Sequence, residues 1–238
     1  MFLLAYPAYS RAEVVERPGE KVSMGQAFID ESGARVTLGS LIDRPTILSF
    51  AYFGCKDMCN TLLANLADSL GRLDAIPGQD YRVITVSFDE RDTPEEAAYK
   101  KQNLLKAVGS PFPEGAWSFL TGSPEAIGAL TGSTGYEFSR AGRGYNHSGA
   151  LVALSPDGRI IRYFYGGSYL PADLKMAIVE GREGRVTASI RKAVTYCYSL
   201  VPEGRGFAFA FIRYAGLGTL LFAAAFIIWL SGKPGRGR

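Results

Sequence analysis

The sequence predicts an α/β domain in which a mixed β-sheet carries helices on both faces. Between residues 21 and 185, apolar runs rich in β-branched and aromatic residues alternate with stretches whose apolar residues recur three and four positions apart. The first pattern is typical of buried strands and the second of amphipathic helices. Hairpin-like turn signals near both ends of this region add antiparallel strand pairs to the alternating units.

The first two and the last two expected strands each form a hairpin. Residues 31–33 (ESG) separate the first pair, and residues 155–158 (SPDG) separate the last. The expected strands are 27–29, 35–37, 45–53, 81–88, 117–120, 150–154 and 160–165.

The expected helices follow from leucine spacing and from capping signals. Leucines recur at helical intervals over residues 61–73. Thr93 before Pro94 is a typical N-cap with proline at the first helical position, and Ser123 before Pro124 repeats the pattern. The expected helices are 61–73, 94–108, 124–130 and 171–180.

The C-terminal region has the composition of a membrane anchor. Residues 214–230 carry no charge, and the longer stretch 207–230 is interrupted only by Arg213. About 20 mostly apolar residues are enough to span a bilayer. We therefore expect a transmembrane helix over 207–230, joined to the domain by a connector over 186–206. A buried core helix is the alternative.

The charge distribution predicts the orientation of that anchor. Residues 1–200 have a net charge of −1, whereas residues 201–238 have a net charge of +4. The tail 231–238 is basic, so the positive-inside rule puts it in the cytoplasm and the main domain on the periplasmic side of a bacterial cytoplasmic membrane. The domain has no basic excess, which argues against a nucleic-acid partner. Residues 1–20 are expected to be a signal-peptide remnant or an N-terminal extension.

The scarcity of cysteine and histidine excludes several classes of protein. Three cysteines and one histidine are too few for a disulfide-stapled small fold, a four-sulfur zinc ribbon or a paired-histidine zinc motif. The sequence also has no G-x-x-x-x-G-K-[ST] phosphate loop and no G-x-S-x-G nucleophile elbow.

Two cysteines follow the first central strand in the segment YFGCKDMCNTLL. Cys55 and Cys59 are four residues apart, and positions i and i+4 share a face in a helix. A helix N-terminus and the neighbouring Lys56 would favour thiolates. Two thiolates suit Cu(I), zinc or disulfide formation. The spacing alone is also compatible with two unreactive cysteines.

His147 is expected at the start of the strand 150–154, at the end of the sheet where the cysteine segment is also expected. A lone histidine is most often a satisfied core or surface residue. Together with Cys55 and Cys59, however, it would complete a two-sulfur, one-nitrogen ligand set that suits copper. Zinc would accept the same ligands with a fourth added.

Four segments in this order resemble the SCO/SenC family of thioredoxin-fold copper proteins that serve cytochrome c oxidase assembly. They are residues 47–70, 83–102, 119–138 and 146–166. The resemblance implies a thioredoxin-like fold and copper, as Cu(I) or Cu(II), on Cys55, Cys59 and His147. It implies copper delivery to the CuA centre of oxidase subunit II, with other copper chaperones as further partners. The alternative is that Cys55 and Cys59 are a redox pair that keeps the cysteines of that subunit reduced.

The sequence departs from the family pattern at several positions. Lys56 and Asn60 stand where the family usually has proline, and Asn146 stands where it commonly has aspartate. Asp57 matches. A C-terminal anchor resembles a bacterial subgroup. Cys197 in the connector is expected to be a partly buried cysteine; the alternatives are a disulfide between molecules or a free reactive thiol. It is not expected to be a ligand.

Overall fold

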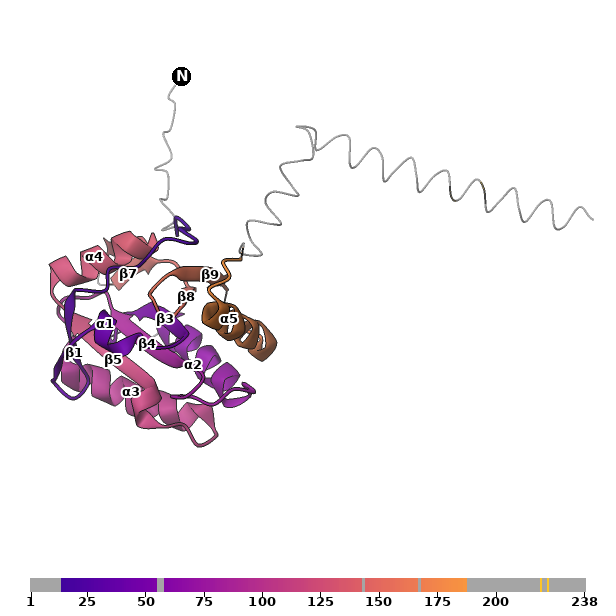
Figure 1. The fold of residues 1–238 in the computed structure, drawn as a ribbon. Coiled ribbons are helices and arrows are strands. Elements are labelled where there is room, and N and C mark those ends of the chain that lie inside the picture. Colours follow the sequence, from indigo (N-terminus) through magenta and orange to yellow (C-terminus); the bar gives the residue numbers. More distant parts are fainter. Residues whose placement is uncertain are drawn as a thin grey trace, which may run out of the picture. The chain divides into compact units, whose positions relative to one another are not determined.

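The computed structural model describes residues 14–54, 58–142, 144–166 and 168–187, together with Thr219 and Phe222 (Figure 1). Several sequence predictions fall wholly or mostly outside these residues: the segment 1–20, the connector 186–206, the span 207–230, the tail 231–238 and Cys197. Among the residues that are described, no helix combines the length and the apolar character needed to cross a membrane.

In the described part of the chain, a seven-stranded sheet has the order β2-β1-β5-β4-β3-β8-β9. Its strands are β1 (Ala27–Asp30), β2 (Arg35–Thr37), β3 (Thr46–Ala51), β4 (Arg82–Ser87), β5 (Trp117–Gly122), β8 (Ala150–Leu154) and β9 (Ile160–Tyr165). β3, β4 and β5 pair in parallel, and the remaining pairs are antiparallel. The predicted mixed sheet is therefore confirmed, including its two hairpins.

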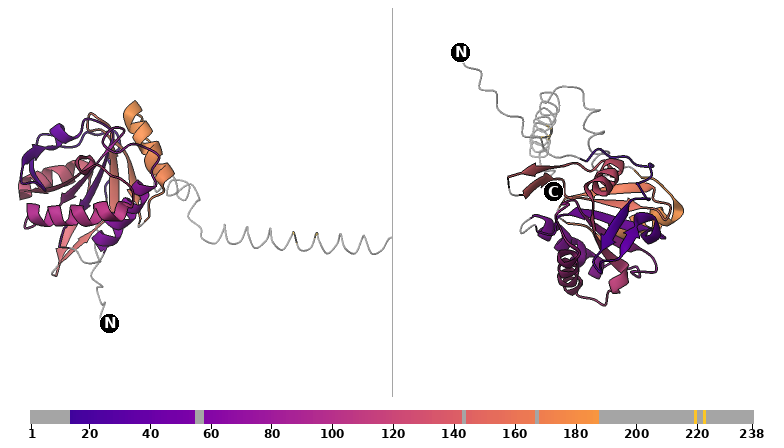
Figure 2. Two further views of the ribbon diagram at one scale, coloured as in Figure 1. Left: turned by 90° about the horizontal axis from the view of Figure 1, so that it is seen from below. Right: turned by 90° about the vertical axis from the view of Figure 1, so that its left-hand side faces the viewer.

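Helices cover both faces of this sheet (Figure 2). They are α1 (Leu38–Leu41), α2 (Met58–Gly71), α3 (Pro94–Val108), α4 (Pro124–Thr134) and α5 (Pro171–Glu183), with a 3₁₀ helix at Glu114–Ala116. One buried cluster contains Leu66 of α2, Leu104 of α3 and Leu174 of α5. The other contains Leu38 of α1 and Ile127 of α4. The sheet thus separates two apolar layers.

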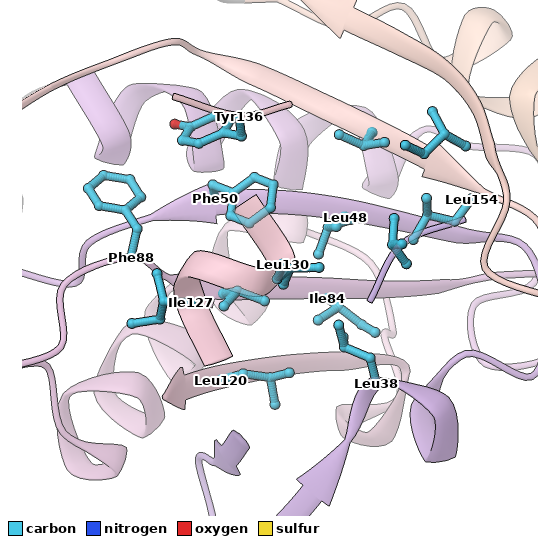
Figure 3. Close-up of a cluster of buried hydrophobic side chains, with 14 of the residues drawn as sticks. Leu38, Leu48, Phe50, Ile84, Phe88, Leu120, Ile127, Leu130, Tyr136 and Leu154 are labelled. Atoms are coloured by element: carbon cyan, nitrogen blue, oxygen red, sulfur yellow. The ribbon is translucent and has the colours of Figure 1, made fainter. Parts of the chain in front are cut away.

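The sequence of strand β3 is mostly apolar because the strand is buried on both faces. All its residues are buried. Ile47 and Ala51 face the layer that contains α2, and Leu48 and Phe50 face the layer that contains α4, where Figure 3 shows them among other buried side chains. Successive side chains of a strand point to opposite faces, so a strand covered on both sides has apolar residues on both of its faces.

The capping signals mark the helix starts as predicted. Thr93 accepts a hydrogen bond from the Glu96 N–H, and the Glu96 side chain accepts one from the Thr93 N–H. Ser123 caps α4 by accepting from the Ala126 N–H. Each cap satisfies N–H groups that the first helical turn leaves without partners.

Four helix ends differ from the sequence prediction, and α1 is absent from it. Helix α2 covers Met58–Gly71 instead of residues 61–73. Helices α4 and α5 continue past the predicted residues 130 and 180, and each ends at a left-handed glycine, Gly135 or Gly184. Glycine adopts a positive φ without steric cost, so it sets the end of a helix more strictly than the loss of apolar periodicity does.

The structure contains a second, two-stranded sheet that the sequence does not predict. Strands β6 (Phe138–Ala141) and β7 (Gly144–His147) form a separate antiparallel pair. The expectation that His147 begins the strand 150–154 is therefore wrong, because His147 is the last residue of β7. The register pairs Phe138 with His147 and Arg140 with Tyr145, so these four side chains share one face of the hairpin.

Candidate metal centre

The antiparallel pairing of β3 with β8 defines the edge of the sheet at which the candidate site lies. Ser49 pairs with Leu151, so the chain leaving β3 and the chain entering β8 are at the same end of the sheet. Helix α2, which carries Cys59, follows β3, and β7, which carries His147, precedes β8. The fold therefore brings the helix with one candidate ligand and the strand with another to a common edge.

Cys59 is the second residue of α2. Its side chain, and Cys55 together with Lys56 and Asp57, lie outside what the structure describes. The first N–H groups of a helix have no partner within the helix, and its N-terminus carries partial positive charge. Both effects favour a thiolate over a thiol at this position. Convergence of the two cysteines on one ion remains a prediction.

Gly149 allows the histidine segment to close on the first turns of α2. A Cβ built on Gly149 would lie 2.7 Å from Cδ1 of Leu62, closer than side chains can approach. Leu62 follows Cys59 by about one helical turn. The backbone just after His147 therefore lies against the part of α2 that contains Cys59.

The imidazole of His147 is partly buried and is held through one ring nitrogen. Its Nδ1 lies 3.1 Å from the hydroxyl of Tyr136 and 3.1 Å from the carbonyl oxygen of Ser148. Burial lowers the pKa of His147, and the hydrogen bond to the Ser148 carbonyl opposes this shift only in part. A lowered pKa keeps the ring neutral at pH 7, and the neutral form is the one that binds metals.

Aromatic side chains surround His147. The ring of Phe88 lies 5.1 Å from the imidazole and the ring of Tyr52 lies 6.3 Å from it, measured between centroids. Tyr145 packs against both of these rings at 5.2 Å. This shell excludes water from one side of the imidazole, which is the physical cause of its desolvation.

Asp92 fixes the chain where β3 leads into the cysteine segment. Its Oδ2 accepts a hydrogen bond from the Phe53 N–H at 2.5 Å and another from the Ser87 hydroxyl at 2.6 Å. Burial raises the pKa of Asp92 above its usual value, and the two hydrogen bonds oppose this shift only in part. Phe53 is two residues before Cys55, so Asp92 anchors one end of the loop that carries this cysteine.

The Asp92→Ala variant should lower the free energy of unfolding by about 2 kcal/mol, because it leaves the Phe53 N–H and the Ser87 hydroxyl without their charged acceptor. Urea denaturation of the metal-free protein measures this loss. Asp74→Ala is the matched control, since the Asp74 side chain is 91% exposed and its ion pair with Lys175 should contribute less than about 1 kcal/mol. Equal stability of the two variants would contradict the anchoring role.

Asn60, one of the departures from the family pattern, links α2 to α3. Its Oδ1 accepts a hydrogen bond from Nζ of Lys100 at 2.6 Å. Proline at this position could not make that contact. The ammonium group of Lys100 therefore lies beside the residue that follows Cys59, where positive charge favours thiolate.

Asn146, the other departure within the described residues, lies on the far face of the hairpin. It pairs with Ser139 in the register, whereas His147 pairs with Phe138. Side chains alternate between the two faces of a strand, so residue 146 points away from the face that carries the imidazole. The loss of an aspartate here removes charge from the opposite face of β7.

Among the residues whose side chains are described, no three histidine, cysteine, aspartate or glutamate side chains gather as a metal-binding group. His147 is the member of the predicted set that is described in full. It offers a neutral imidazole with hydrogen-bonded Nδ1, which is how metal-binding histidines are usually oriented. The chemistry of the predicted donor set, two thiolates and one imidazole, fits copper.

Sequence reasoning did not identify Tyr136, Phe88 or Asp92 as part of the site. Tyr136 follows Gly135 at the end of α4, and nothing local marks its hydroxyl as a partner of His147. Asp92 directly precedes Thr93, the N-cap of α3. The local sequence therefore indicates a helix start and not a contact with Phe53. All three residues reach the site through contacts with segments distant in sequence, which local patterns do not reveal.

The fold and this edge define a thioredoxin-like α/β domain with a candidate soft-metal centre where β3 leads into α2. The family model SCO1/SenC matches residues 16–180. The chain belongs to the SCO1/SenC family, as the sequence resemblance implied.

Individual relatives agree with this assignment. The mitochondrial protein SCO1 homolog 1 of Arabidopsis thaliana is 29% identical over 158 residues, which cover 63% of this chain and 44% of that protein. The chain therefore spans less than half the length of this relative. The SCO1 protein homolog of Bacillus subtilis is 26% identical over 151 residues, covering 61% of this chain and 75% of that protein.

Solved structures show the same fold. A protein of Aquifex aeolicus VF5 superposes with a TM-score of 0.64 at 28% identity, covering 71% of this chain and 96% of that one. Arabidopsis thaliana ScoI, whose crystal structure has copper bound, superposes with a TM-score of 0.55 at 25% identity, covering 67% of this chain and 96% of that one.

Proposed function

We propose that the chain binds one copper ion through Cys55, Cys59 and His147 and delivers it during cytochrome c oxidase assembly. The observation that carries this proposal is the position of His147, whose strand ends beside the first turns of the helix that carries Cys59. Family membership and the copper bound to Arabidopsis thaliana ScoI support the choice of metal.

The donor set suits both oxidation states of copper. Two thiolates and an imidazole provide three-coordinate binding for Cu(I), and a fourth ligand completes the coordination of Cu(II). Zinc prefers four ligands in a closed structural site. The neutral state that burial imposes on His147 prepares the imidazole for either copper ion.

The acceptor in this proposal is the CuA centre of oxidase subunit II, and other copper chaperones are the source of the metal. The anchor over 207–230 holds the domain on the periplasmic face of the bacterial cytoplasmic membrane, with the tail 231–238 in the cytoplasm. A tether of this kind raises the effective concentration of donor and acceptor at one membrane face.

A thiol–disulfide oxidoreductase that reduces the cysteines of subunit II is the second candidate. The position of Cys59 at the N-terminus of α2, with Lys100 nearby, favours this function because both stabilise a reactive thiolate. Exchange of electrons between Cys55, Cys59 and a target disulfide does not require an imidazole. His147 therefore separates the two functions.

The His147→Ala variant should bind Cu(I) more than about 100-fold more weakly than the wild-type protein, because loss of a partner outside the ligand set already costs 10–100-fold. Anaerobic competition against a Cu(I) chelator measures the affinity of the full chain in detergent. Reversible oxidation of Cys55 and Cys59, followed by thiol labelling, should stay intact in the same variant.

Asn146→Ala is the matched control for this measurement, because residue 146 is the neighbour of His147 on the opposite face of β7. Its copper affinity should stay within about threefold of the wild type. Wild-type affinity in the His147→Ala variant would remove His147 from the ligand set and would favour the oxidoreductase.

A further inference from the structure

Tyr136 is fixed by the core beside the candidate centre. Its side chain is almost fully buried. The ring stacks on Phe50 of β3 at 4.4 Å between centroids and lies 6.1 Å from Phe88. Figure 3 shows the three rings together at one end of this apolar layer. The position of the Tyr136 hydroxyl is therefore set by packing and does not depend on a metal.

The hydroxyl of Tyr136 takes part in a triangle of polar atoms. It donates to the carbonyl oxygen of Ser148 at 2.6 Å. It also lies 3.1 Å from Nδ1 of His147, and that nitrogen lies 3.1 Å from the same Ser148 oxygen. Each vertex of the triangle contacts the other two.

The positions of the protons in this triangle follow from the chemistry of its atoms. A carbonyl oxygen can only accept, so the short contact with Ser148 uses the single hydroxyl proton of Tyr136. Nδ1 of His147 then faces two oxygens that have lone pairs to offer. If Nδ1 carried no proton, lone pairs would oppose one another in at least one of its contacts. A proton on Nδ1 satisfies all three contacts at once.

We propose that Tyr136 is a positioning residue that, together with the Ser148 carbonyl, holds His147 in the tautomer with the proton on Nδ1, so that Nε2 is the metal-binding nitrogen. The tautomer of a histidine ligand is set by the hydrogen bond that its other nitrogen makes. The consequence for copper rests on the proposed function, whereas the tautomer is a property of the metal-free protein.

The single histidine of the chain makes the tautomer directly measurable. Two-bond proton–nitrogen correlation spectra of the ¹⁵N-labelled, metal-free full chain in detergent resolve the two imidazole nitrogens. At a pH above the pKa of His147, the wild type should show a protonated Nδ1 and an unprotonated Nε2. In Tyr136→Phe, which keeps the ring and its stacking, the Nδ1 proton keeps the Ser148 carbonyl as an acceptor but loses the hydroxyl oxygen. The fraction of the tautomer protonated on Nε2 should therefore rise above that of the wild type.

Tyr163→Phe is the matched control, because Tyr163 is also buried and its hydroxyl donates to the Thr134 carbonyl at 2.9 Å. This variant loses a buried hydroxyl in the same apolar layer and should retain the wild-type imidazole spectrum. An Nε2-protonated wild type, or a Tyr136→Phe spectrum identical to that of the wild type, would overturn the proposal.

Copper affinity tests the consequence of this tautomer. Cu(I) should bind Tyr136→Phe about tenfold more weakly than wild type or Tyr163→Phe, which is the usual scale for losing an orienting partner of a ligand. Equal affinities of Tyr136→Phe and wild type would overturn the positioning role. Absence of copper binding in the wild type would overturn the proposed function, while the tautomer would still be decided by the spectra.

Discussion

Simultaneous replacement of Cys55 and Cys59 by serine should abolish tight, one-to-one copper binding. Both thiolates are lost in this variant, and His147 alone supplies one neutral nitrogen. Hydroxyl groups are poor ligands for Cu(I), which prefers soft sulfur donors. The expected loss is therefore larger than for any other variant considered for this chain.

Anaerobic Cu(I) titration of the reduced full chain, with a competing chelator, measures this effect. Cys197→Ser is the matched control, because it removes the remaining cysteine, which the predicted ligand set does not include. It should bind one copper as tightly as wild type. Tight stoichiometric binding by the double variant would refute the metal proposal, and loss of binding in Cys197→Ser would place a ligand in the connector.

Replacement of Phe88 by alanine should lower the free energy of unfolding by about 3–5 kcal/mol, as is usual for a fully buried phenylalanine. Its ring contacts Tyr52, Phe138 and Tyr145 as well as His147. Removal of the ring leaves a cavity between the main sheet and the β6–β7 hairpin. Loss of stability should therefore be accompanied by looser placement of His147.

Urea denaturation of the metal-free protein measures the change in stability. Tyr99→Ala is the matched control, since it removes an aromatic ring that is 70% exposed on α3, and it should change stability by less than about 0.5 kcal/mol. A Phe88→Ala variant as stable as Tyr99→Ala would show that the hairpin does not depend on this ring.

The elements that the sequence predicts well are those with a strong local pattern. β3 and β4 are buried on both faces, so their sequences are mostly apolar and rich in β-branched residues. The start of α3 has a full capping box in adjacent residues. Each of these signals acts within a few positions of the chain, so it is visible without knowledge of the fold.

The β6–β7 hairpin lacks such a pattern. One face carries Phe138 and Tyr145, but the other carries Ser139 and Asn146. The hairpin packs on Phe88, which directly follows the distant strand β4. Strand propensity depends strongly on such non-local partners. The location of His147 at the correct edge was predictable from strand order, but its strand and its contact with Tyr136 were not.

The pairing of β3 with β8 also governs when the site can form during folding. The cysteine segment joins β3 to α2 in the first half of the domain, whereas His147 ends β7, about 90 residues further along the chain. Contacts between segments so distant in sequence form late, because the chain between them must first be ordered. A partly folded domain thus carries its thiols before it carries its imidazole. The proposed three-ligand copper site accordingly requires the completed fold, and in this proposal metal offered earlier meets only the two sulfurs.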